Sequence, residues 1–307
     1  MKSFFFKIFH QETLHLEAII NDEKLNEEEL LTLVSSLLMA RKLLNELIPA
    51  SNSGQGWRIL NRTQRLLLKK KSLNKEQQLH KQLLNEGFSR HPLICLAEVE
   101  IINELNMVSS DLGKLLQKLK APMVLFKIRS FLESLNNSQD LEILPGFAAQ
   151  LMLKWLYPIH LTLADQAQQP NLATQKQLFC ALLELNVFSR LLGSFNNPLW
   201  KMTSLESTAL REALELLLAA EYYFERIRLP ARKAAQKLNH FISLEKILNE
   251  ADAEFWADWH ENYHMTAPEI FQKMRTIYDA YCNDWLQLWN KAENDKLWRR
   301  FYNQTLE

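Results

Sequence analysis

Hydrophobic positions recur with the period of an α-helix along most of the chain. Most prolines follow or open a stretch of this periodicity, as expected where proline occupies a first helical turn or ends a helix. Capping patterns at 203–206 and 266–269 precede two further runs, one continuing through Arg228 and one to about Trp298. The pattern predicts roughly ten helices and no strand pair.

Glycine content supports this fold class. The chain has only six glycines in 307 residues, whereas average usage is about 7% and β-rich folds need glycine for turns and bulges. We expect an all-α protein, built as an irregular multi-helix bundle, with an α-solenoid as the alternative. The polar segment 49–56 predicts a flexible loop within a single domain, 1–307.

Charge and hydropathy exclude several classes of partner for the molecule as a whole. The 36 basic residues balance 36 acidic residues, so no net field attracts nucleic acid or an anionic membrane. The longest apolar stretch, 144–164, contains two prolines and a lysine, which predicts a broken core helix and no membrane span. Residues 1–9 do not resemble a signal peptide. Three cysteines in apolar helical segments predict reduced core thiols in a cytoplasmic protein: Cys95, Cys180 and Cys282.

Residues 260–264, with the sequence HENYH, match a zinc-binding pattern. In HExxH, two histidines one helical turn apart bind zinc, and the glutamate between them activates the bound water. The match resembles the active site of a zinc metallopeptidase. It implies His260 and His264 as ligands and Glu261 as the general base, with zinc as the cofactor where none is otherwise expected.

A third ligand on a following helix would complete such a site. The candidates are Glu269, Asp284 and Glu293. If a turn at 266–268 starts that helix, Asp284 lies about 24 Å along it, so only Glu269 is close enough to His264. Glu269 is also the expected capping-box partner of Thr266. The other interpretation places both histidines at the border of an apolar stripe and assigns them no metal.

A basic segment from Arg58 to Lys75 is the strongest local concentration of charge. Within it, a basic stripe follows i, i+4, i+7 and i+11 and therefore lies on one helical face: Arg58, Arg62, Arg65 and Lys69. Such a stripe fits an acidic partner, a phosphate backbone or an anionic surface. The alternative is an exposed face whose cations pair with the acidic segment 21–29 of the same chain.

Aromatic residues are concentrated near the carboxyl end. Five of the eight tryptophans lie in this region, among them Trp285, Trp289 and Trp298. Most fit apolar stripes and predict core packing. With Arg299 and Arg300, they also have the composition of a protein-interaction hot spot, where Trp, Tyr and Arg are enriched.

These patterns favour a non-enzymatic adaptor or scaffold, within a larger bacterial assembly, that binds protein partners of acidic character. A zinc metallopeptidase using residues 260–264 is the first alternative. A binder of nucleic acid or anionic surfaces through residues 58–71 is the second, and it is not the favoured one because the overall charge is balanced.

Overall fold

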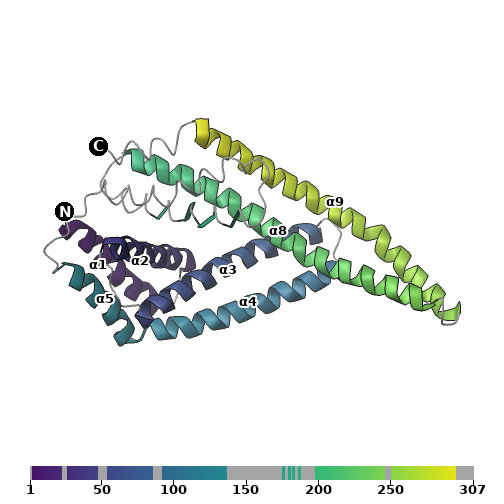
Figure 1. The fold of residues 1–307 in the computed structure, drawn as a ribbon, viewed down its shortest axis with the longest axis horizontal. Helices are drawn as coiled ribbons and strands as arrows, with labels where there is room; N and C mark the ends of the chain where they lie inside the picture. The colour runs from purple at the N-terminus through teal and green to yellow at the C-terminus, as the bar shows by residue number, and fades with distance from the viewer. Residues whose placement is uncertain are drawn as a thin grey trace. The chain divides into compact units, whose positions relative to one another are not determined.

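The computed structural model describes residues 2–22, 26–47, 54–85, 92–136, 198–245 and 250–294, and four helical pairs between 175 and 187. In this part of the chain the protein is all-helical, with seven helices and no strand (Figure 1). The helices are α1 (Lys2–Asn21), α2 (Glu27–Leu47), α3 (Gln55–Leu83), α4 (Pro92–Leu119), α5 (Pro122–Asn136), α8 (Pro198–Glu245) and α9 (Glu250–Asn294). The predicted all-α class is confirmed for these residues. None of these helices carries an apolar stretch long enough to cross a membrane.

Several helix ends follow directly from the sequence. Pro92, Pro122 and Pro198 are the first residues of α4, α5 and α8, where the missing N–H of proline removes no intrahelical hydrogen bond. Helix α2 is capped by Asn26, whose Oδ1 accepts a hydrogen bond from the backbone N–H of Glu29 at 3.2 Å. Three glutamates in the first turn of α2 also stabilise the helix, because their negative charges interact favourably with the positive end of the helix dipole.

Three expected boundaries are wrong. Helix α8 begins before the capping pattern at 203–206 and continues through Pro230, and α9 runs without a break through residues 266–269. A proline inside a helix costs about 3 kcal/mol, and packing of the turn before Pro230 offsets part of this cost. Ile227, one turn before Pro230, is fully buried in the core.

The chain divides into two compact units. Unit 1 comprises Met1–Lys71, Met107–Leu214 and Leu286–Glu307, and unit 2 comprises Ser72–Asn106 and Glu215–Trp285. All four boundaries fall inside helices, namely α3, α4, α8 and α9. Each unit is therefore assembled from segments that are distant in sequence, and no loop separates the two.

The core of unit 1 is formed by apolar residues of α1 to α5, and α1 packs against α2 and α5. Gly56, in the first turn of α3, is buried. A Cβ atom there would lie 3.2 Å from Cγ1 of Ile128 and 3.4 Å from Cγ1 of Val124, both on α5. Glycine therefore permits close approach of α3 to α5. Of the predicted loop at 49–56, residues 49–53 lie outside the described residues, and α3 begins at Gln55.

The core of unit 2 is formed by α3, α4, α8 and α9. On α3 the buried positions are spaced by three or four residues, which is the spacing of one helical face. Two of them are polar, in an otherwise apolar series: Leu73, Glu76, Leu79, His80 and Leu83.

Candidate partner-binding surface

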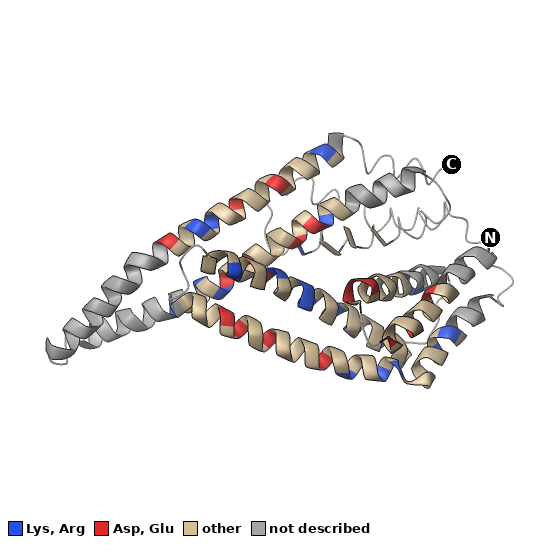
Figure 2. Cartoon of the chain, turned by 180° about the vertical axis from the view of Figure 1, so that it is seen from behind, with Lys and Arg blue, Asp and Glu red and all other residues tan. Residues whose placement is uncertain are grey.

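The predicted basic stripe lies on α3, and all four of its side chains are exposed. Figure 2 shows the basic positions along the helices in blue. Arg58 and Arg65 make no ion pair with any residue that the structure describes. The guanidinium of Arg62 lies 3.7 Å from the carboxylate of Asp111, and the two side chains are 63% and 44% exposed. An exposed pair of this kind stabilises a protein by about 0–1 kcal/mol, so Arg62 also remains available to another carboxylate.

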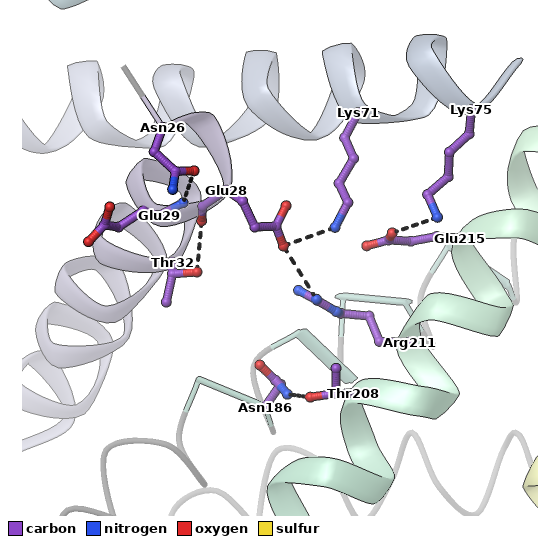
Figure 3. Close-up of polar contacts among 10 residues, drawn as sticks. All are labelled: Asn26, Glu28, Glu29, Thr32, Lys71, Lys75, Asn186, Thr208, Arg211 and Glu215. Carbon is purple, nitrogen blue, oxygen red and sulfur yellow. Dashed lines mark hydrogen bonds and ion pairs between the residues drawn. The ribbon is translucent and has the colours of Figure 1, made fainter. Parts of the chain in front are cut away.

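The two lysines that follow the stripe are paired within unit 1. Lys70 Nζ lies 2.5 Å from Glu27 Oε1, and Lys71 Nζ lies 3.1 Å from Glu28 Oε1. Glu28 also lies 3.6 Å from Arg211 of α8, so one carboxylate of α2 contacts cations from two helices (Figure 3). Pairing with the acidic segment, which was the alternative for this region, thus holds for Lys70 and Lys71.

Lys75, the last cation of the basic segment, belongs to unit 2. Its Nζ lies 3.3 Å from Oε2 of Glu215, whose side chain is only 6% exposed (Figure 3). This lysine therefore neutralises a buried carboxylate and is not part of the exposed surface. What remains for a partner is the guanidinium surface, which we define as Arg58, Arg62 and Arg65.

A cavity of about 420 Å³ lies beside this surface, within unit 1. It is lined by α2, α3 and the helical pairs at 179–187: Ser35, Leu38, Met39, Arg41, Lys42, Asn61, Gln64, Arg65, Leu68, Cys180, Leu183 and Val187. Three of the lining residues are basic and none is acidic. The sequence did not predict this cavity, because it depends on Cys180, Leu183 and Val187 lying near α2 and α3.

The zinc motif lies on α9. Since α9 is continuous, positions 260 and 264 are one helical turn apart, as HExxH requires. The side chains of His260, Glu261 and His264 are outside the described residues, so the metal site stays a prediction from the sequence. Among the described side chains, no group of three His, Cys, Asp or Glu residues could hold a metal ion.

Helix continuity changes the argument about the third ligand. Glu269 is exposed and lies five residues after position 264 on the same helix, about 140° around its axis. Asp284 lies about 30 Å along the axis, whereas a zinc ligand must come within about 2 Å of the metal. Glu293 is farther along α9, and its side chain is outside the described residues. No following helix begins at 266, so a third ligand would have to come from another element.

The aromatic cluster is only partly described. Trp285 is fully buried and Trp289 is 4% exposed, so the core-packing interpretation accounts for both, and neither offers a surface to a partner in this structure. Trp298, Arg299 and Arg300 lie outside the described residues. Among the cysteines, Cys95 and Cys180 are exposed, so the prediction of core thiols is wrong for these two.

Unit 2 contains a polar network that the sequence analysis missed. Arg226 of α8 donates hydrogen bonds from Nε to Glu76 Oε2 at 2.6 Å and from Nη1 to Glu104 Oε1 at 2.8 Å. Burial raises the pKa of Glu76, and the nearby Arg226 opposes this rise. Burial alone would lower the pKa of Arg226, but the hydrogen bonds to Glu104 and Glu76 outweigh it and raise that pKa.

The second polar pair of unit 2 joins His80 to Tyr223. His80 Nδ1 lies 2.9 Å from the Tyr223 hydroxyl, and its Nε2 lies 3.8 Å from Glu98 Oε2. Burial lowers the pKa of His80, and the charge of Glu98 opposes the shift. Burial also raises the pKa of Tyr223, with smaller contributions from Glu98 and Glu76. A neutral imidazole and a neutral phenol are therefore the forms that this core favours.

No protein-family model, curated protein or solved structure matches this chain. Its function must therefore follow from its own residues and their geometry.

Proposed function

We propose that the protein is a helical adaptor whose guanidinium surface on α3 binds an acidic protein partner. One observation carries the proposal: Arg58 and Arg65 are exposed and make no ion pair within the described residues, although the lysines further along α3 are paired with α2. Three like charges on one helical face repel one another, and carboxylates of a partner would relieve this repulsion. Arginine suits the role because its guanidinium binds a carboxylate through two parallel hydrogen bonds.

The test compares two triple variants with equal changes in charge. Arg58→Glu, Arg62→Glu and Arg65→Glu reverse the guanidinium surface, whereas Lys118→Glu, Lys120→Glu and Lys127→Glu reverse exposed positions on α4, just after α4 and on α5. We expect the arginine variant to bind the co-purified partner more weakly by on the order of 10- to 100-fold, and the lysine variant to bind as the wild type does.

Two results would refute the adaptor proposal. Equal loss of the partner in both variants would show a general effect of charge with no dedicated surface. Loss of the bound material on nuclease treatment would identify it as nucleic acid and favour the alternative function of residues 58–71. Binding to an acidic protein should also weaken as salt is raised.

A zinc metallopeptidase is the second candidate. The observation that favours it is the unbroken helix α9, which places positions 260 and 264 one turn apart. The chemistry would require His260 and His264 as ligands and Glu261 as the base that activates water. Stoichiometric zinc in the purified protein, lost in His264→Ala, would support this function. A metal-free protein whose stability is unchanged by excess zinc would eliminate it.

A further inference from the structure

We propose that the cavity between α2 and α3 takes an apolar side chain of the acidic partner, whose flanking carboxylates bind Arg41 and Arg65. The inference rests on the proposed adaptor function and names the feature of the partner that this site would recognise. It turns a general attraction of charges into a specific one, because the partner must present an apolar group and an acid side by side.

The cavity has the size and the apolar lining needed to bind an apolar side chain. The cavity volume of about 420 Å³ lies within the range of about 300–1,000 Å³ that is typical of ligand sites. Leu38 and Met39 of α2 and Leu68 of α3 line one part of the cavity, and Leu183 and Val187 of the helical pairs at 179–187 line another part. The hydrogen bond from Gln64 Nε2 to Ser35 Oγ, at 2.9 Å, ties α2 to α3 beside the cavity. The site therefore exists without a partner and requires little rearrangement to receive one.

The basic residues that line the cavity favour an acidic ligand. Arg41 lies over the Trp57 ring, 5.1 Å from its centroid, and makes no ion pair with any described residue. Burial lowers the pKa of Arg41, which means that its charge is partly desolvated, and none of the described residues supplies a counter-charge. Lys42 and Arg65 line the same cavity. A ligand that enters here with a carboxylate would supply the missing counter-charge, whereas a basic ligand would be repelled.

The cavity is continuous with the guanidinium surface on α3. Arg65 both lines the cavity and belongs to the guanidinium surface, and Arg62 and Arg58 lie about one and two turns before it on the same face. A partner segment that follows α3 along these arginines therefore passes the cavity at Arg65. Acidic residues would bind the arginines, and an apolar residue between them would enter the cavity, as anchors do at protein interfaces.

Cys180 provides a direct readout, because it is exposed and lines the cavity. The probe is a short acidic peptide with one central phenylalanine, and its control has alanine at that position. We expect the phenylalanine peptide to slow alkylation of Cys180 by N-ethylmaleimide and to leave alkylation of the exposed Cys95 unchanged. The alanine peptide should bind at least about tenfold more weakly than the phenylalanine peptide, since it buries less apolar surface.

Variants separate the cavity from the rest of the surface. Cys180→Trp fills the cavity from an exposed position and leaves the guanidinium surface intact, so it should weaken binding of both the peptide and the native partner. Arg41→Gln should weaken peptide binding, whereas Lys118→Gln, at an exposed position on α4, should not.

Three results would overturn the inference. The first is equal protection of Cys180 by the phenylalanine and alanine peptides. The second is protection by decanoate or by an oligonucleotide but not by the phenylalanine peptide, which would assign the cavity to a small amphipathic acid or to nucleic acid. The third is unchanged binding of the native partner by Cys180→Trp. If that result accompanies loss of the partner in the triple arginine variant, the adaptor function stands and only the cavity inference fails.

Discussion

Replacement of Arg226 with methionine should leave the carboxylate of Glu76 buried without its guanidinium partner. Glu76 is 2% exposed, and Arg226 donates the 2.6 Å hydrogen bond to it. Removing one member of a buried ion pair typically destabilises a protein by about 3–5 kcal/mol, because the remaining charge stays desolvated. Glu104 and Glu100 also lie near Arg226, but they are 28% and 52% exposed and keep contact with water.

The origin of this cost can be isolated with a second substitution. Adding Glu76→Gln to Arg226→Met removes the buried charge, so the double variant should be more stable than Arg226→Met alone. Arg275→Met is the matched control in the same unit, since Arg275 is 82% exposed and lies 3.9 Å from Asp279. We expect the control to change stability by no more than about 1 kcal/mol.

The assay is hydrogen exchange resolved by peptide, combined with urea denaturation. Local exchange is needed because a chain with two compact units need not unfold in one transition. Faster exchange in the parts of α3 and α8 that belong to unit 2 is the expected signature of Arg226→Met. A double variant no more stable than the single one would refute the reasoning, as would equal effects of Arg226→Met and Arg275→Met.

Three further outcomes follow from the structure. Burial lowers the pKa of His80, so as the pH falls the unfolded chain binds this proton before the folded protein does, and stability present above about pH 6.5 is lost. The unfolding temperature of His80→Gln should therefore depend less on pH between 7 and 5 than that of the wild type. Equal pH dependence of the two proteins would contradict this. Gly113→Ala should stabilise the protein by about 0.5–1 kcal/mol in urea denaturation, because α4 has open space at that position. Gly56→Ala should instead destabilise it by about 1–3 kcal/mol, because its Cβ would crowd Ile128, and equal effects of the two alanines would show that packing at Gly56 is looser than the structure indicates.

Helix formation was predictable because it depends on local chemistry. The low glycine content and the prolines at 92, 122 and 198 predict helices and three of their first residues. The same rule fails at Pro230, since the cost of one interior proline is smaller than the packing energy of a long helix. Local patterns can indicate where a helix is able to end, but tertiary packing decides whether it does.

The candidate site was predictable only in part, for a related reason. The charges of Arg58 and Arg65 are visible in the sequence, and so is the acidic segment 21–29, which contains the partners of Lys70 and Lys71. The cavity of unit 1 and the polar network of unit 2 are each formed by residues from segments that are far apart in the chain. Arg226, for example, binds a carboxylate 150 residues before it, and nothing local to either residue indicates this pairing.

The segmental composition of unit 2 has a consequence during synthesis. Its first segment ends at Asn106 and its second begins at Glu215, so α3 and α4 leave the ribosome before α8 has been made. At about 5–20 residues per second, residues 107–214 take roughly 5–20 s to translate. Throughout that interval the apolar face of α3, with Glu76 and His80 among its leucines, has no α8 to cover it. A nascent chain of this kind is a natural substrate for chaperones, which would shield the exposed face until its second half arrives.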